Sequence, residues 1–231
     1  MNSLTNLISF YNEKPLVSLA EKFLVQTKIE ENLAKEFFAK LYQTSGNYLR
    51  SNNDLCTLIL DDRSRFLRNA AECVTWLGET LIWHQLHLNE CQPFLESFTQ
   101  IYGTETIDMV RHVLKFIDSD LIVAKLGISL FAFSNNQLIF NSDSSIKSMD
   151  IRPIVRIQNS YAQITWNYLL YKYGFHQTIQ RWINLIQCFL AATNAMDRAQ
   201  IIDKHVHDIN SLVEETELSL VLDDIESADE D

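Results

Sequence analysis

Apolar residues recur at steps of three and four along most of this chain. That spacing gathers them on one face of an α-helix, which turns about once every 3.6 residues. The clearest example is a segment whose apolar and aromatic residues all keep this step: Ile154, Ile157, Tyr161, Ile164, Tyr168 and Tyr171. The pattern predicts a helix there, with one face buried.

The same pattern predicts further helices, with few breakers between them. The 231 residues include 5 Gly and 3 Pro, which is little material for strands joined by tight turns. The stretch from Pro93 to Gly103 is predicted as a short irregular or β-turn segment near 91–103, and residues 141–150 as a polar loop. The predicted helices cover residues 4–11, 29–50, 61–87, 107–140 with a break near 118–120, and 177–213.

This organisation predicts a single all-α domain. Roughly ten helices follow one another without an internal repeat or an interior linker. The domain is expected over residues 1–226, followed by an acidic tail over 227–231. The chain is 47% hydrophobic, which is enough apolar material for one substantial core.

Charge and segment length exclude two classes of partner. The formal net charge is −11, and an acidic chain is repelled by phosphate backbones, so no direct contact with nucleic acid is expected. The longest apolar run, residues 121–133, includes Lys125 and is too short to span a bilayer. No membrane association is expected.

The cysteines are scattered and indicate neither a zinc finger nor a disulfide framework. No two of them have paired zinc-ligand spacing. Because nothing suggests a disulfide framework, a reducing compartment fits the chain. They occupy positions Cys56, Cys73, Cys91 and Cys188.

Two groups of residues raise the question of chemistry. Asp61 and Asp62 stand at the start of a predicted helix, where carboxylates satisfy free N–H groups, and this explains them better than catalysis does. His84, His87 and Cys91 share a helical face and could bind zinc, but packing or surface roles explain them more simply. With no nucleophile elbow and no glycine-rich phosphate loop, we expect no enzyme, metal or cofactor.

The stretch "LILDDRSRFLR", residues 58–68, resembles the helix 3 to helix 4 signature of nuclear receptor ligand-binding domains. In that family a leucine-flanked Asp-Asp-Gln or Asp-Gln precedes Leu-Leu-Lys or Leu-Leu-Arg. Arg63 replaces the usual glutamine. Counting back from Asp61 without a gap places Arg50 at the lysine that closes the family's helix 3.

Other landmarks keep the order of the family. "LIFNSDS", residues 138–144, is similar to the end of helix 8 in retinoid X receptor-like domains, and Arg181-Trp182 stands where an Arg-Phe pair opens helix 10. "LVLDDI", residues 220–225, occupies the place of the terminal activation helix. Asp224 departs from the family because an apolar residue is expected there, and the eight-cysteine DNA-binding module is missing.

The resemblance implies a three-layer antiparallel helical sandwich of about ten to twelve helices. It also implies a ligand-responsive or orphan transcription-regulator domain, located in the nucleus or also in the cytoplasm. The residues themselves leave a second interpretation open, an all-helical adaptor domain with a filled core and no ligand. A central pocket would distinguish the two.

The resemblance also assigns residues to a ligand pocket. Because Ile82 falls where retinoid receptors hold the ligand carboxylate with an arginine, any ligand is expected to be a lipophilic small molecule without a carboxylate anchored there. The expected lining residues are Phe37, Leu41, Leu77, Leu81, Phe94, Phe98 and Tyr102.

Two protein-binding surfaces follow from the same resemblance. Arg50, Arg68 and Asp223 are expected at a groove for coactivator or corepressor helices, with only weak coactivator binding because Asp224 should loosen the terminal segment. The long helix over 177–213 carries more apolar residues in its middle than one buried face can use. The family uses this element for dimerisation, so a homodimer, or a heterodimer with a retinoid X receptor-like partner, is expected. Its dimer face comprises Arg181, Ile183, Ile186, Phe189 and Leu190.

Overall fold

The structure is a computed structural model that describes residues 18–19, 21–22, 31–134 and 150–229. Eight α-helices and one 3-10 helix lie wholly within these ranges, which contain no strand, so the all-α prediction is confirmed. The predicted helix over 4–11 and the loop over 141–149 lie outside the described residues. The elements are α3 (Glu31–Ser51), α4 (Asn53–Cys56), α5 (Leu60–Gln85), η1 (Leu88–Glu90), α6 (Gln92–Tyr102), α7 (Thr104–Leu114), α8 (Leu121–Ala132), α10 (Ile151–Ala199) and α11 (Asp203–Asp229).

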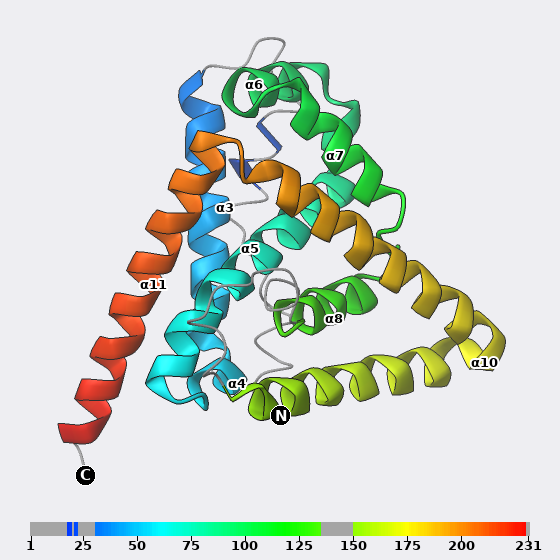
Figure 1. Ribbon diagram of the computed structural model, residues 1–231. Coiled ribbons are helices and arrows are strands. Elements are labelled where there is room, and N and C mark those ends of the chain that lie inside the picture. Colours follow the sequence, from blue (N-terminus) through cyan, green and yellow to red (C-terminus); the bar gives the residue numbers. More distant parts are fainter. Residues whose placement is uncertain (1–17, 20, 23–30, 135–149, 230–231) are drawn as a thin grey trace.

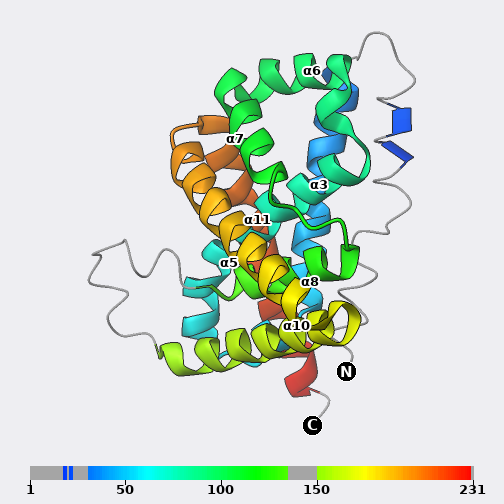
Figure 2. The ribbon, with the colours of Figure 1, turned by 90° about the vertical axis from the view of Figure 1, so that its right-hand side faces the viewer.

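The helix α5 crosses the interior of the molecule (Figures 1 and 2). It begins at Leu60, directly before the Asp61–Asp62 pair, and nearly every residue from Phe66 to Trp83 is buried. The helices α3, α7, α8, α10 and α11 all pack against it. A helix that is buried around most of its circumference needs neighbours on several sides, and this arrangement provides them.

An aromatic cluster joins α5 to α3 and α6. The Trp83 ring centroid lies 4.8 Å from those of Phe94 and Phe98, both at steep interplanar angles. The Phe38 centroid lies 5.4 Å from that of Phe98 and 5.1 Å from that of Tyr102. Three of these four contacts are edge-to-face, a geometry that stabilises a core beyond simple burial.

The expectation of an irregular or β-turn segment near 91–103 is wrong, because residues 92–102 form the regular helix α6. Pro93 lies in its first turn, where the missing N–H is not needed, so this proline starts the helix instead of interrupting it. Gly103, with φ of 86°, ends the helix.

The helix α10 bends sharply at Gly174, where φ is 72° and ψ is 170°. We call residues 151–173 the first limb, residues 175–199 the second limb, and the bend between them the elbow. Figure 1 shows the two limbs as the sides of a wedge that meet at the elbow. Far from the elbow, the Tyr161 hydroxyl donates a hydrogen bond of 2.8 Å to Asp54, which ties the first limb to α4.

The prediction of one helix over 177–213 is wrong at its second half. The chain leaves the helix after Ala199 and begins α11 at Asp203. No proline or glycine causes this corner. The turn lets α11 lie alongside α3 and pack on α5 (Figures 1 and 2), and such packing overrides local helix propensity.

Candidate functional site: the elbow of α10 and its exposed face

Two aspartates in the loop between α7 and α8 face the elbow. Asp120 caps α8, because its Oδ1 accepts a hydrogen bond of 3.0 Å from the backbone N–H of Ile122. Asp118 accepts a hydrogen bond of 2.8 Å from the backbone N–H of Asp120. Hydrogen bonds from the local backbone therefore orient each carboxylate independently of its contacts with α10.

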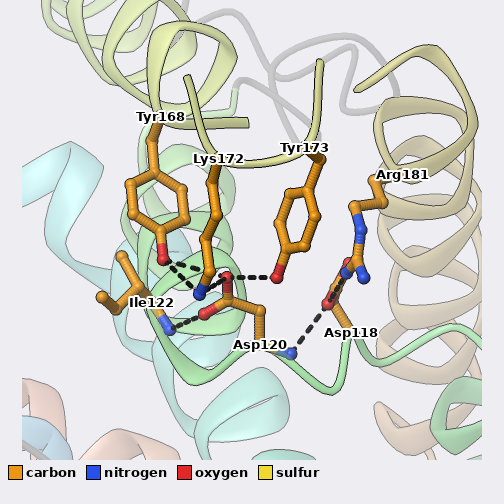
Figure 3. Close-up of polar contacts among 7 residues, drawn as sticks. All are labelled: Asp118, Asp120, Ile122, Tyr168, Lys172, Tyr173 and Arg181. Carbon is orange, nitrogen blue, oxygen red and sulfur yellow. Dashed lines mark hydrogen bonds and ion pairs between the residues drawn. The ribbon is translucent and has the colours of Figure 1, made fainter. Parts of the chain in front are cut away.

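Three side chains of the first limb converge on the other oxygen of Asp120. Tyr168, Lys172 and Tyr173 donate to Oδ2 at 2.9, 2.9 and 2.8 Å (Figure 3). The carboxylate side chain is only 6% exposed, so these bonds operate with little competition from water. Tyr168 and Lys172 are four residues apart, which is why they share one face of the limb.

The second limb is fixed to the same loop. Arg181 donates a hydrogen bond to Asp118 (Figure 3), and its guanidinium lies 3.8 Å from the centroid of the Tyr173 ring. We call Asp118, Asp120, Tyr168, Lys172, Tyr173 and Arg181 the elbow clamp. It sets the angle between the two limbs by binding both of them to one loop.

The pKa shifts indicate a structural role for the elbow clamp. Burial alone would raise the pKa of Asp120, but hydrogen bonds from Lys172, Tyr173 and Tyr168 outweigh it and hold that pKa at about 2. Hydrogen bonds with Tyr168 and Asp120 raise the pKa of Lys172, and burial raises that of Tyr173. All three shifts move away from neutral pH, whereas an acid or base catalyst needs a pKa near it.

The second limb carries exposed apolar side chains on one face, which we call the seam. Ile183 is 49% exposed and Leu190 is 67% exposed. The members follow one another at steps of four, four, three and four residues, and so lie in line along the helix. The seam consists of Phe175, Ile179, Ile183, Ile186 and Leu190.

The part of the seam from Ile183 to Leu190 lies on a helix segment without charge. Residues 182–196 contain no Asp, Glu, Lys or Arg, although the chain has a net charge of −11. Exposed apolar residues scattered singly are normal, but a contiguous row of them marks a contact surface. The elbow clamp orients this row, because it fixes the start of the second limb.

The opposite face of the second limb is firmly packed. Leu185 and Cys188 are buried, and a Cβ added to Gly127 of α8 would lie 2.8 Å from Leu185 Cδ1. Glycine thus permits the close approach of α8 and the second limb. The limb has two apolar faces, one buried in the body of the protein and one open.

The residues expected at a dimer face divide between these two faces. Ile183, Ile186 and Leu190 belong to the seam. Phe189 instead stacks on Phe131 with centroids 5.0 Å apart, and Arg181 binds Asp118. Phe175 and Ile179 were missed, although continuing the same period backwards would have included them.

The residues expected to line a ligand pocket are not gathered around one cavity. Phe37 and Phe94 contact each other with centroids 5.8 Å apart within the aromatic cluster, and Leu41 is fully buried. Leu77 and Leu81 line a crevice of about 10 Å³ between α5, α8 and α10, the volume of about one water probe. Phe98 also lies in the aromatic cluster, and Tyr102 lines a separate depression.

That depression has a volume of about 990 Å³ and lies between α3, α6 and α11. Its lining mixes aromatic and charged side chains, which include Phe38, Tyr42, Tyr102, Lys35, Lys40, Asp208 and Glu215. It is only partly enclosed, unlike the buried pocket that the resemblance implies. A ligand there would meet both apolar and charged groups.

A buried polar cluster lies beside this depression. The Tyr42 hydroxyl is 3.3 Å from His205 Nδ1, and the Tyr102 hydroxyl donates to Asp208 at 3.3 Å. Glu79 Oε1 is buried without a hydrogen-bond partner among the described residues, and burial raises the pKa of Glu79 to about 8. Burial lowers the pKa of His205 to about 4. Sequence reasoning missed Glu79, which stands in the apolar run "WLGETLIW".

Of the residues expected at a coregulator groove, Arg68 meets the chain's own α11. Arg68 donates a hydrogen bond of 2.7 Å to Asn210 of α11 and lies 3.7 Å from Glu72. Arg50 binds Asn47 on its own helix. Asp223 belongs to α11, beyond the residues whose side chains are described. The expected short terminal segment is not separate, since α11 continues to Asp229.

The described ranges contain no metal-binding cluster and no candidate membrane span. The side chains there include no group of three or more His, Cys, Asp or Glu that could hold a metal ion. No helix in those ranges is both long enough and apolar enough to cross a bilayer. No protein-family model and no curated protein sequence matches the chain.

Proposed function

We propose that the chain is a protein-interaction domain that pairs with a second copy of itself through the seam on α10. The observation that carries this proposal is the row of five exposed apolar side chains on the second limb of α10, three of them in a stretch without charged residues. A row of one chemical type is self-complementary, because two copies related by a two-fold axis can bury the same residues against each other.

Physical estimates support association of moderate strength. Fully burying a large aliphatic side chain contributes about 1.5–3 kcal/mol, and association costs at least about 4 kcal/mol in lost freedom. The free energy gained by burying five half-exposed side chains from each copy is larger than that cost. The missing charges on residues 182–196 also avoid the desolvation penalty that ionised groups would add.

The test is the oligomeric state of matched variants. Light scattering and sedimentation at micromolar concentration should detect a dimer of the natural chain. Ile186→Lys places a charge on the seam and should weaken the dimer at least about tenfold. Asn184→Lys adds the same charge at an exposed position that has no seam residue three or four positions away, and it should leave the dimer almost unchanged. A monomeric natural chain, or equal effects of both lysines, contradicts the proposal.

A second candidate function follows from the resemblance: a nuclear receptor-like transcription-regulator domain, folded as a three-layer sandwich, that binds a lipophilic molecule and a retinoid X receptor-like partner. The depression of about 990 Å³ supports this candidate by its size alone, since it has room for a small molecule beside Tyr102, whereas its charged lining differs from the apolar pocket of the resemblance. Native mass spectrometry should then find a co-purifying lipid, and light scattering should find a mixed dimer with such a partner. If the chain carries no small molecule and binds no such partner, the second candidate is excluded and the self-associating interaction domain is the remaining proposal.

A further inference from the structure

The depression between α3, α6 and α11 has an apolar wall and a polar inner end. Phe38, Tyr102 and Leu212 belong to the wall and are buried. Tyr42 and Tyr102 bring their hydroxyl groups to the inner end, where they meet the polar cluster described above. The lining comes from α3, α6, α11 and residues 18, 19 and 22, so the site is independent of the seam on α10 and of the function proposed for it.

The hydroxyl groups at the inner end make long hydrogen bonds. Tyr42 lies 3.3 Å from His205 Nδ1, and Tyr102 donates to Asp208 at 3.3 Å. Both distances exceed the usual range of such bonds, which ends at about 3.0–3.2 Å. Burial raises the pKa of Tyr42 and a hydrogen bond with Tyr102 acts in the opposite direction, so the two hydroxyl groups are neighbours. Their oxygens can therefore accept a stronger donor.

Two acidic side chains stand close to both phenols. Burial is the largest cause that raises the pKa of Tyr42 and of Tyr102, and the charges of Glu79 and Asp208 add to it. Glu79 Oε1 is buried and has no hydrogen-bond partner among the described residues. Burial raises the pKa of Glu79 to about 8, and no cation among the described residues lowers it. The inner end thus holds an acid that lacks a positive neighbour.

An ammonium group matches this set of atoms. It has a positive charge and three N–H donors but no acceptor, and the inner end offers hydroxyl and carboxyl oxygens. The ring of Tyr102 adds an aromatic face, with the Phe38 ring 5.1 Å away, and such faces attract cations. An anion would be repelled by Asp208. A metal ion fits less well, because the described side chains include no group of acids and histidines that could hold one.

The lysines of the lining do not take this place. Lys22 and Lys35 are exposed, and Lys40 donates a hydrogen bond of 2.8 Å to Gln43. Exposed charges act through water, where their repulsion of a cation is weak compared with the attraction of carboxylates inside the protein. The inner end therefore decides which charge the depression prefers.

We propose that the depression binds a small organic amine. The protonated nitrogen lies at the inner end, against the hydroxyl oxygens of Tyr42 and Tyr102 and the carboxylate of Asp208. The apolar body of the amine covers Phe38 and Leu212. This occupant differs from the lipophilic molecule of the second candidate function, which needs no charge and an enclosed apolar pocket.

The test compares three small molecules of the same shape and different charge. Phenethylamine is the probe, and phenethyl alcohol and hydrocinnamate are its neutral and anionic counterparts. Isothermal titration calorimetry of the full chain at neutral pH should find the amine bound at least about tenfold more tightly than either counterpart. No binding of the amine, or equal binding of the alcohol, overturns the proposal.

Proton release is a second readout. A nearby ammonium favours the charged form of Glu79, so amine binding at neutral pH should release protons, which titrations in buffers of different ionisation enthalpy measure. Burial keeps both tyrosines protonated and holds the pKa of His205 at about 4, so neither residue type is a source. The titratable and charged groups around this acid come from α3, α5, α6 and α11: Tyr42, Arg68, Glu72, Tyr102, His205 and Asp208.

Two substitutions assign the readouts to the site. Glu79→Gln should abolish the proton release and weaken amine binding several-fold, and it should fold because glutamine resembles the uncharged acid. Glu214→Gln is the matched control, since Glu214 is an exposed acid of α11 outside the lining, and it should change neither. Tyr102→Phe keeps the ring and should weaken binding of the amine but not of the alcohol. Proton release that survives Glu79→Gln, or equal effects of Glu79→Gln and Glu214→Gln, contradicts the proposal.

Discussion

At the scale of single residues, Glu79 places a carboxyl group where burial disfavours its charged form. Its carboxyl oxygen Oε1 is buried and unpaired among the described residues, and its pKa is raised by burial to about 8. An ordinary glutamic acid has a pKa of 4.5. At neutral pH the side chain is therefore mostly a protonated acid, which is less costly to bury than its anion.

We predict that Glu79 makes stability fall as pH rises. Between pH 4.5 and about pH 8 the folded chain keeps this proton while the unfolded chain loses it, so the free energy of unfolding decreases across that window. Glu79→Gln should remove this slope and be about 2 kcal/mol more stable than the natural chain at pH 8. Urea unfolding at several pH values measures it. Parallel pH profiles for the two chains would contradict the assignment.

Asp120 has the opposite linkage. Its folded pKa of about 2 lies below the ordinary 3.8, so it stabilises the fold above pH 3.8 and loses this effect as pH falls towards 2. At pH 7, Asp120→Ala should cost about 2–3 kcal/mol through the lost cap and lost charged hydrogen bonds. Asp120→Asn keeps the cap and should cost less. The difference between Asn and the natural chain should shrink as pH approaches 2, measured by urea unfolding; a constant difference would exclude the charged contacts as its source.

At the scale of elements, the elbow depends on one glycine. Gly174 has φ of 72° and ψ of 170°, a backbone region that is almost restricted to glycine. A Cβ there would meet nothing within 4 Å. The requirement comes from the backbone conformation alone, so a substitution tests the bend without adding a clash.

Gly174→Ala should destabilise the chain by about 1–3 kcal/mol and should also weaken dimerisation, because the second limb would lose its fixed direction. Gly103→Ala is a matched control. Gly103 also has positive φ, 86°, with nothing within 4 Å of the added Cβ, but it joins α6 to α7. It should cost similar stability and leave dimerisation intact. Thermal unfolding and light scattering separate the two effects, and equal loss of dimer in both variants would speak against a special role of the elbow.

The helical spacing of apolar residues was sufficient to predict most elements. It failed where packing between helices, and not the local sequence, makes the chain turn. The helices over 29–50 and 61–87 correspond closely to α3 and α5. The corner between Ala199 and Asp203 has no local signal, because only the surfaces of α3 and α5 create it. Pro93 misled the prediction for a different reason, since proline breaks the interior of a helix but suits its first turn.

At the scale of the whole molecule, charge opposes the association that the seam favours. Each chain has a net charge of −11, so two chains repel each other at long range. The Debye length falls from about 30 Å at 0.01 M salt to about 8 Å at 0.15 M. We predict that dimerisation strengthens several-fold over this range of salt, measured by sedimentation. A dimer that weakens with salt would point to ion pairs in place of the seam.

The candidate sites show how far a single sequence can lead. Ile183, Ile186 and Leu190 were predicted at a protein contact because their segment has more apolar residues than one buried face can use, and they are exposed. The elbow clamp was not predictable, because Asp120 and Tyr173 are 53 residues apart and no pattern joins them. The partner of Arg68 was missed for the same reason, since Asn210 follows it by 142 residues.

The order in which the chain is made gives the packing of α11 on α3 and α5 another importance. Tyr42 precedes His205 by 163 residues. Ribosomes add roughly 5–20 residues per second, so α3 and α5 emerge on the order of 10–30 s before the helix that covers them. During that interval the nascent chain presents Gly46 and its surroundings uncovered. A chaperone that shields this surface would meet it before α11 can.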